Sequence, residues 1–382
     1  MTPQRHSPAS PRSARSRPAG EIPLDELLVA VTGPHERMAF SLDATRIGND
    51  DVPVEEVVVL EKPFCTLRRF QRHAKRQDPR VLIVAPLSGH YATLLRDTVA
   101  GLLPDHDVYI TDWIDAQQVP LAAGRFDLDD NIDHVIEFLH RLGPGVHVLA
   151  VCQSAVPTLA AVALMAVTDD PDQPRSMILM GGLIDTARNP TRIAGIVHAT
   201  SFPWIESRLI LPVPPHLPGA LRPVYPASLQ RAGLLLYLAR HLEYVPGPHP
   251  KVRVFGDPNF ADPRFCQELL TVMDLPAELF LQTIRVLFQE RALPRGVMAS
   301  RGRAVQPERI RRTALMTVEG ALDDVSGLDQ TRAAHDLCAG LPAGRRVHHE
   351  QAGVGHFGMF TGRAWRAEIL PRVRDFVRAQ ER

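Results

Sequence analysis

Three residues that could carry out acyl transfer occur along the chain in the order cysteine, aspartate, histidine. Cys152 directly follows the apolar run VHVLAV (146–151), Asp323 follows the run ALMTVEG (314–320), and His356 comes later in a glycine-rich segment. A cysteine thiolate can attack an acyl carbon when a histidine takes the thiol proton and a carboxylate orients the imidazole. The order nucleophile, acid, histidine is that of one large class of hydrolases.

The segment around Cys152 has the layout of a nucleophile elbow, in which a strand, a tight turn and a helix follow one another. Such a turn needs small residues two positions before and after the nucleophile. Ala150 and Ser154 fill these positions, where glycine is usual, so the segment is a variant of G-x-S-x-G. A helix that begins behind the turn favours the thiolate through its positive N-terminal end. The alternative is a small buried hydrophobe, the commonest role of a free cysteine, and the local pattern leaves both interpretations open.

Two acidic residues follow the apolar run that ends at Gly320. Asp323 and Asp324 stand in the segment EGALDDVSG, at the carboxyl end of the expected strand, where a triad acid can reach its histidine. Asp323 is preferred because it stands three residues after Gly320 in a G-x-x-D turn. Asp185, in the segment MGGLID after the preceding expected strand, is the weaker candidate for the acid.

The segment RRVHHEQAGVGHFGMF contains three histidines. His348 and His349 fall within an expected strand, whereas His356 lies in the loop beyond it, between Gly355 and Gly358. Glycine gives the backbone freedom that lets an imidazole turn inward. Position, loop composition and order in the chain therefore favour His356 as the base.

The loop PLSGH (86–90) directly follows the expected strand that begins at residue 81. In hydrolases of this layout one oxyanion donor is the backbone N–H after the nucleophile, here Gln153, and the second comes from this loop. We expect the second donor to be the N–H of Leu87 or of Ser88, between which the sequence does not choose. His90 either lines the entrance to the site or has no part in it.

Short apolar runs alternate with segments of helical period from about residue 55 onward. The runs have four to six apolar or β-branched residues and end in turn-forming residues; they are 81–86, 107–113, 146–151, 176–182 and 314–320. Between two of them, residues 127–142 place apolar side chains on one helix face behind an acidic first turn. Strand–helix alternation predicts a mostly parallel sheet flanked by helices. With the elbow, it predicts an α/β-hydrolase fold.

Residues 187–298 interrupt this alternation, because they are rich in proline and aromatic residues and then become helical. We expect an insertion between the sixth and seventh units of the sheet that forms a lid; packing helices that merely extend the core are the alternative. The expected organisation is a disordered basic tail and N-terminal extension (1–54), a first part of the core (55–186), the lid (187–298) and a second part of the core (299–382).

Charge and cysteine content exclude several classes of protein. Lys+Arg and Asp+Glu are both 43, so no overall field favours nucleic acid or an anionic membrane. The longest apolar stretch, 155–167, is too short to span a bilayer. The first twenty residues carry four arginines and no acid, which indicates a disordered tail instead of a secretory signal, with a transit peptide as the weaker alternative. The four cysteines, Cys65, Cys152, Cys266 and Cys338, form no C-x-x-C pair, which favours reduced thiols in the cytosol and no metal site.

Long blocks of the chain occur in an order that is typical of one family. They include LIVAPLSGHYATLLRDTV, DHDVYITDWIDAQQVPLAAGRFDLDD, VHVLAVCQSAVPTLAAVALMA, QPRSMILMGGLIDTARNPT, LMTVEGALDDVSGLDQT and HHEQAGVGHFGMFTGRAWRAEILPRVRDF. From about Val57 to Val377 the chain resembles the intracellular polyhydroxyalkanoate (polyhydroxybutyrate) depolymerases.

The resemblance implies a cysteine–aspartate–histidine triad that hydrolyses amorphous polymer granules in the cytoplasm, without metal or cofactor. The nucleophile of the family stands in a V-C-Q block that matches Cys152, its acid in a V-E-G-x-x-D-D block that matches Asp323, and its histidine in a G-V-G-H block that matches His356. The family commonly has proline after V-C-Q. This chain has Ser154 there, which is small enough to keep the elbow.

Other functions fit the same elements less well. Trp204, Tyr225 and Phe265 could contact the polymer from the lid, or could belong to its packing core. A polyhydroxyalkanoate synthase shares the fold but favours G-x-C-x-G and an Asp-His pair at the acid, where this chain has A-V-C-Q-S and Asp-Asp. Thiolysis by CoA stays open because one acyl-enzyme can serve either acceptor. A non-enzymatic granule-binding protein would not need the complete triad. The oligomeric state is not predicted.

Overall fold

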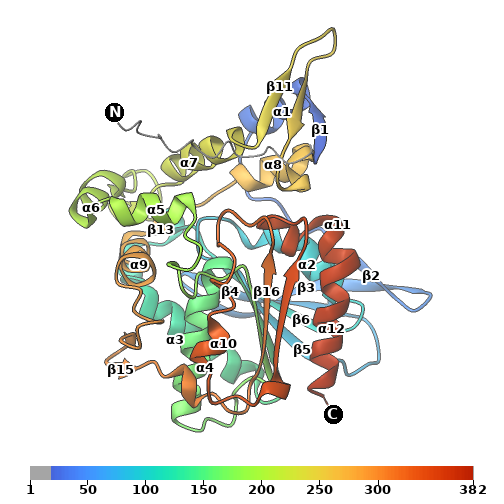
Figure 1. The fold of residues 1–382 in the computed structure, drawn as a ribbon, viewed down its shortest axis with the longest axis vertical. Coiled ribbons are helices and arrows are strands. Elements are labelled where there is room, and N and C mark those ends of the chain that lie inside the picture. Colours follow the sequence, from blue (N-terminus) through green and yellow to red (C-terminus); the bar gives the residue numbers. More distant parts are fainter. Residues whose placement is uncertain (1–18, 382) are drawn as a thin grey trace, which may run out of the picture.

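The computed structural model describes residues 19–381, and its centre is a nine-stranded sheet (Figure 1). The strand order is β17-β16-β8-β7-β5-β6-β4-β3-β2. The strands are β2 (Ala44–Ile47), β3 (Asp50–Lys62), β4 (Cys65–Arg72), β5 (Arg80–Val84), β6 (Asp107–Trp113), β7 (His147–Val151), β8 (Ser176–Met180), β16 (Ala314–Gly320) and β17 (Arg346–Gln351). From β6 to β17 all pairs are parallel, whereas β4, β3 and β2 are joined antiparallel. The expected mostly parallel sheet is confirmed.

The expected strands coincide with β5, β6, β7, β8 and β16 to within two residues at either end. Every residue of β7 and β8 is buried. Strands that are covered on both faces cannot alternate polar and apolar residues, so they appear in the sequence as continuous apolar runs. This is why the sequence located the central strands well.

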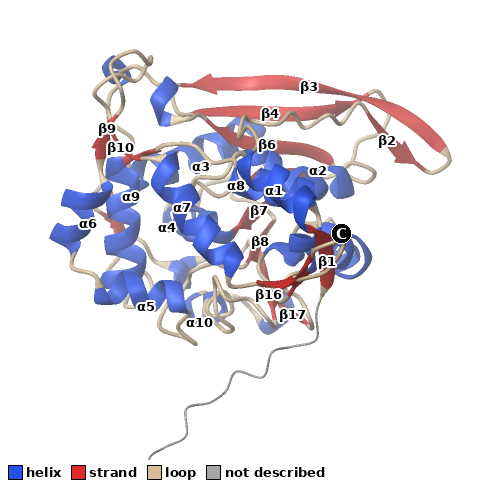
Figure 2. Cartoon of the chain, turned by 90° about the horizontal axis from the view of Figure 1, so that it is seen from above, coloured by secondary structure: helices blue, strands red, loops and turns tan. Residues whose placement is uncertain are grey.

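The antiparallel edge begins earlier than the sequence indicated (Figure 2). The expected boundary after residue 54 falls inside β3, and β2 precedes it. Most residues of β3 are exposed or half-buried, and pairs of acids separate its apolar residues, so the short run at 57–60 does not mark the full length of this strand. The core of the sheet therefore starts at β2.

Helices cover both faces of the sheet. They are α2 (Arg96–Leu102), α3 (Leu128–Leu142), α4 (Ala155–Val167), α10 (Ala334–Leu337), α11 (Gly362–Ala364) and α12 (Leu370–Ala379). Figure 1 shows α3 and α4 on one side and α2 and α12 on the other. The predicted helix at 127–142 is confirmed as α3, which starts with a capping box between Asp127 and Asp130. No helix among residues 19–381 combines the length and the apolar character that crossing a membrane requires.

Most of the region 187–298 lies over one end of the sheet, and its last part runs beside α3 (Figure 1). Its helices are α5 (Arg192–Ala199), α6 (Phe202–Leu209), α7 (Ala227–Ala239), α8 (Pro263–Leu270) and α9 (Ala277–Thr283). Its short strands are β9 (Leu211–Pro212), β10 (Pro223–Tyr225), β11 (Leu242–Val245), β12 (Lys251–Val254) and β13 (Leu275–Pro276), followed by the hairpin β14 (Ala299–Ser300) and β15 (Arg303–Ala304). All these strands pair antiparallel.

Part of the N-terminal extension joins this region. Strand β1 (Gly20–Pro23) pairs antiparallel with β12, and α1 (Leu24–Thr32) packs on α8. We call residues 187–298 together with β1 and α1 the cap. The expected disordered tail at residues 1–18 lies outside the described residues.

Arg222 ties the cap to the core. Its side chain is 1% exposed, and its guanidinium donates hydrogen bonds to the carbonyls of Val119, Pro120 and Gly124, at 2.7–3.1 Å. These carbonyls belong to the segment between β6 and α3. A buried guanidinium with three carbonyl partners holds that segment in place, because its buried N–H groups need acceptors.

We predict that Arg222→Met lowers the free energy of unfolding by about 2–4 kcal/mol, because it removes three hydrogen bonds, one of them to the buried residue Val119, while the methionine retains most of the packing. Urea denaturation measures the change. The matched control is Arg312→Met, since Arg312 also donates to carbonyls, of Asp169 and Asp170, but is 53% exposed. Equal losses in both variants would contradict the role assigned to Arg222.

Candidate active site

The nucleophile elbow is present at the end of β7. Cys152 has a φ of 57°, a 3₁₀ turn covers Cys152–Ser154, and α4 begins at Ala155. A positive φ is rare outside glycine and marks backbone strain that the surroundings must hold. Cys152 is 9% exposed, so the thiol lies just beneath the surface of the core layer. The strand, turn and helix occur where the sequence predicts them.

The side chain of Ser154 stabilises the turn through two hydrogen bonds. Its hydroxyl accepts a hydrogen bond from the N–H of Val151 at 2.9 Å and donates to the carbonyl of Val84 at 2.7 Å. The side chain is 1% exposed and bridges β7 and β5. Proline, which the resemblance leads one to expect at this position, could not make either bond.

His356 and Asp323 form a buried pair. Nδ1 of His356 lies 2.8 Å from Oδ2 of Asp323, and the two side chains are 3% and 1% exposed. Oδ1 of Asp323 accepts the N–H groups of Val325 and Ser326, at 2.8 and 2.9 Å, and Oδ2 also accepts the Ser326 hydroxyl. These hydrogen bonds hold the carboxylate in one orientation, so that it orients the imidazole. Ser326 was not singled out in the sequence, because a serine in a loop carries no distinguishing signal.

The charge state of His356 depends on its two neighbours. Burial lowers the pKa of His356, but the charges of Asp323 and Cys152 and hydrogen bonds to both outweigh it and raise this pKa well above 6.5. Gly181, with a φ of 58°, packs against the ring, and a β-carbon there would lie 3.0 Å from Cε1. The structure thus brings Cys152, Asp323 and His356 together in one buried site.

Asp324, the neighbour of Asp323, faces the cap instead. It accepts a hydrogen bond from the hydroxyl of Tyr237 at 2.7 Å and lies 3.2 Å from Nε2 of His241. Burial acts against ionisation, but the bonds from His241 and Tyr237 prevail and lower the pKa of Asp324. Asp185, the weaker candidate, pairs with Arg291 and Arg188 away from the histidine. The geometry therefore favours Asp323 as the acid over both alternatives.

Asp257, a cap residue that the sequence did not indicate, supports the histidine loop. Its side chain accepts the N–H of Gly358 at 2.8 Å and that of Asn259 at 3.0 Å. Burial raises the pKa of Asp257, and these bonds together with the charge of His356 oppose the increase. In the sequence, Asp257-Pro258-Asn259 is indistinguishable from an ordinary turn, so only the fold reveals this contact.

The loop at 86–90 reaches the elbow. The N–H of Leu87 donates to Oε1 of Gln153 at 3.1 Å, so this candidate oxyanion donor already has a partner. Leu87 is buried, whereas Ser88 is exposed. Nε2 of His90 lies 3.1 Å from the carbonyl oxygen of Leu269 in α8, so His90 contacts the cap. Burial lowers the pKa of His90 to about 4, so the side chain is neutral at pH 7.

The three aromatic candidates for substrate contact lie in different settings. Phe265 is 7% exposed and packs on Phe357, the residue after His356, with ring centroids 5.4 Å apart. Tyr225 stacks on Phe280 at 4.0 Å. Trp204 is 50% exposed on α6. Phe265 thus belongs to the wall behind the histidine, and Trp204 to the surface of the cap.

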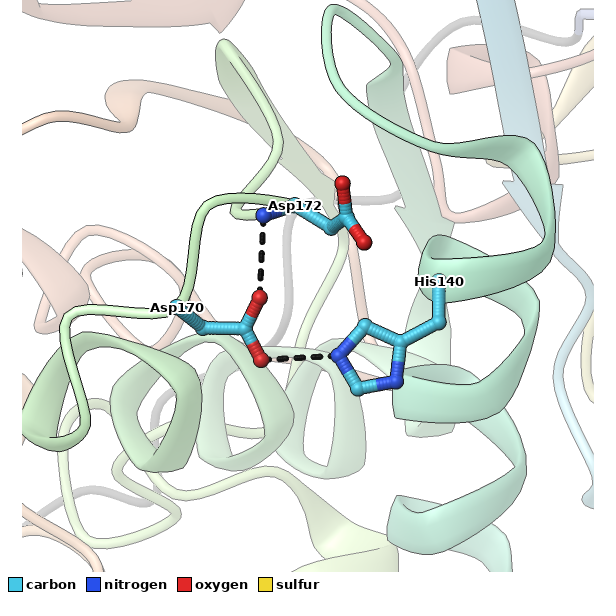
Figure 3. A group of neighbouring side chains, drawn as sticks. All are labelled: His140, Asp170 and Asp172. Atoms are coloured by element: carbon cyan, nitrogen blue, oxygen red, sulfur yellow. Dashed lines mark hydrogen bonds and ion pairs between the residues drawn. The ribbon is translucent and has the colours of Figure 1, made fainter.

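Outside the site, two other polar groupings are accounted for by their own contacts. His140, Asp170 and Asp172 have ligand atoms within 4.8 Å of one another, but Oδ2 of Asp170 bonds His140 and Oδ1 accepts the N–H of Asp172 (Figure 3). A cavity of about 510 Å³ lies at the amino ends of the central strands; its lining includes Arg69, Arg72 and Arg175, which pair with Asp107, Asp78 and Glu381. Both groupings fasten structural elements together.

The sheet order, the elbow and the buried His–Asp pair define an α/β-hydrolase fold. The chain is similar to solved structures at low sequence identity. The bromoperoxidase from Bacillus anthracis matches with a TM-score of 0.50 and 8% identity over 88% of this chain and 99% of that chain. The meta-cleavage product hydrolase from Pseudomonas fluorescens IP01 matches with a TM-score of 0.48 and 14% identity over 88% and 97%. The naproxen esterase from Bacillus subtilis matches with a TM-score of 0.46 and 13% identity over 85% of this chain and 92% of that chain. At such identities the likeness concerns the fold alone.

The family is given by the sequence. The protein-family model described as "PHB de-polymerase C-terminus" matches residues 181–381, which is more than half of the chain. The chain belongs to this polyhydroxybutyrate depolymerase family and is an ester hydrolase of it. Among curated proteins no sequence matches significantly.

We predict that Asp323→Asn moves the titration midpoint of His356 downward, because Asp323 is the strongest influence that raises its pKa. The folded-state pKa lies above 6.5, so the contribution of protonated His356 to stability is complete below pH 6.5 and is lost as the pH rises through the folded-state pKa. This loss should become smaller and shift to lower pH in the variant. NMR titration and urea denaturation over a pH series measure both effects.

Asp324→Asn is the matched control for this prediction, since it changes the adjacent carboxylate, which contacts Tyr237 and His241 instead of His356. The midpoint of His356 should remain high in this variant. A high midpoint in Asp323→Asn as well would show that Asp323 does not control the imidazole.

Proposed function

We propose that this protein is an intracellular depolymerase that hydrolyses poly(3-hydroxybutyrate)-type polyester with Cys152 as nucleophile, His356 as base and Asp323 as orienting acid. The observation that carries the proposal is the buried His356–Asp323 bond of 2.8 Å next to a cysteine in a strained elbow. A structural cysteine would not need a left-handed backbone at the end of a strand or a hydrogen bond to a buried histidine.

The proposed reaction has two halves. His356 accepts the thiol proton, and the thiolate of Cys152 attacks the ester carbonyl. The tetrahedral intermediate carries its negative charge on the former carbonyl oxygen, which the N–H of Gln153 stabilises; removing one such donor costs ~2.7–4 kcal/mol in comparable sites. The intermediate collapses, His356 protonates the departing hydroxyl end of the polymer, and a thioester forms on Cys152.

Water completes the second half. His356 takes a proton from the water as its oxygen attacks the thioester carbonyl, and collapse of the second intermediate releases the 3-hydroxyacid and returns the thiol. Asp323 keeps Nδ1 protonated throughout, so that Nε2 serves as base and then as acid. Every step uses groups of the chain, the ester and water.

The substrate class is supported by the family and by the cap. A polyester chain is apolar and must reach a thiol that is only 9% exposed beneath the cap. The described cysteines are all free and buried, which is consistent with a reducing compartment such as the cytoplasm. We therefore place the protein in the cytoplasm, at the surface of storage granules.

We predict that wild-type protein releases 3-hydroxybutyrate from amorphous polymer granules and that Cys152→Ala abolishes the release, because no other group can form the acyl-enzyme. The assay measures the acid by chromatography, with and without CoA. Cys338→Ala is the matched control, since Cys338 is equally free and fully buried but lies outside the site.

The outcomes separate the alternatives. Release only in the presence of CoA, as a thioester, would establish thiolysis in place of hydrolysis. Chain extension from 3-hydroxybutyryl-CoA would identify a synthase-like acyltransferase. Equal release by wild type and Cys152→Ala would refute the elbow as the site of catalysis, and no release by wild type would refute the polyester substrate.

A further inference from the structure

The side chain of Gln153 crosses from the elbow to the loop at 86–90. It is 3% exposed, and its Oε1 accepts the N–H of Leu87 at 3.1 Å. Gln153 directly follows the nucleophile, and Leu87 lies in the loop that supplies the second oxyanion donor in this fold. The amide group of Gln153 therefore lies at the edge of the oxyanion site.

The orientation of this amide follows from its partner. The N–H of Leu87 is a donor, so the oxygen of Gln153 must face it and the nitrogen must point away. Nε2 of Gln153 is buried and has no hydrogen-bond partner among residues 19–381. An unpaired buried NH₂ group costs about 1–3 kcal/mol, and an acceptor on a bound substrate would supply the missing partner.

The loop offers no better donor in this arrangement. The N–H of Leu87 is occupied by Gln153, and Ser88 is exposed, whereas an oxyanion donor acts best where water is excluded. The NH₂ group of Gln153 is a buried donor without a partner among residues 19–381, on the residue that follows the nucleophile. Side-chain amides are known to serve as oxyanion donors in hydrolases.

We propose that the NH₂ group of Gln153 is the second oxyanion donor of this enzyme, with Leu87 acting on it as a positioning residue. The inference rests on the proposed function. When the sulfur of Cys152 bonds to the ester carbon, the π electrons move to the oxygen, and Nε2–H and the backbone N–H of Gln153 donate to it. The bond from Leu87 to Oε1 prevents the amide from rotating and polarises its N–H groups.

The test compares Gln153→Ala with wild type on a soluble probe, p-nitrophenyl butyrate. Loss of a donor that acts in the transition state should lower kcat by roughly 10²–10³-fold and leave KM nearly unchanged. The affinity for a trifluoromethyl ketone, which traps Cys152 as a tetrahedral oxyanion, should fall by a similar factor. Alkylation of Cys152 by iodoacetamide forms no oxyanion, so its rate should stay close to that of wild type.

Gln282→Ala is the matched control. Gln282 lies in α9, and its Oε1 likewise accepts a backbone N–H, that of Leu128, at 2.7 Å. Neither Gln282 nor Leu128 belongs to the elbow or to the loop at 86–90. This variant should lose stability only, with kcat and ketone affinity as in wild type.

Several results would overturn the proposal. An unchanged or higher kcat in Gln153→Ala would mean that the amide is not a donor and only obstructs the site. A fall in the iodoacetamide rate as large as that in kcat would mean that the variant deforms the elbow. If turnover of the probe survives Cys152→Ala, the proposed function itself fails; Cys152-dependent turnover with a normal Gln153→Ala variant refutes the donor role alone.

Discussion

Cys152 keeps a φ of 57° between the last residue of β7 and the first turn of α4, a conformation that costs a non-glycine residue about 1–3 kcal/mol. The surroundings hold it there. The hydroxyl of Ser154 is hydrogen-bonded to β7 and β5. Ala150, two residues before Cys152, is fully buried. Gly182 leaves room on the other side, where a β-carbon would lie 2.4 Å from that of Ala155. This conformation places Cys152 at the carboxyl end of the central strand β7, and the other residues of the site are arranged around it.

The cap and the core share the loops that bear the catalytic groups. Tyr237 bonds the residue after the acid, Asp257 bonds the loop of the histidine, and the N–H of Met273 donates to Gly89 in the loop near the elbow. The cap is therefore more than a cover, because three active-site loops have buried hydrogen bonds to it. Opening the cap to admit a polymer would disturb the loops that carry the acid and the base, which couples access to catalysis.

Most buried polar groups of this site have partners. The carboxylate of Asp323 has donors at both oxygens, and Asp323 and Cys152 both raise the pKa of His356. The NH₂ group of Gln153 lacks a partner among residues 19–381. In the proposed reaction the substrate oxygen supplies that partner.

The sequence by itself determined the central strands, α3, the elbow and the order of the triad residues. These features are local: continuous apolar runs report strands buried on both faces, and a reactive residue between a strand and a helix reports the elbow. Glycines beside His356 and the G-x-x-D turn at Asp323 were also local signals, and the bond between the two side chains agrees with them.

Only the tertiary structure decided the features that depend on distant partners. Strand β3 has an exposed, mixed sequence whose pairing with β4 cannot be inferred from its own pattern. The pairing of β1 with β12 joins residues more than two hundred positions apart. Asp257 looks like any turn residue until Gly358 is placed beside it, and Gln153 looks like a backbone donor until Leu87 occupies its oxygen. Burial and hydrogen-bond partners across the fold, which no local sequence pattern encodes, gave these residues their roles.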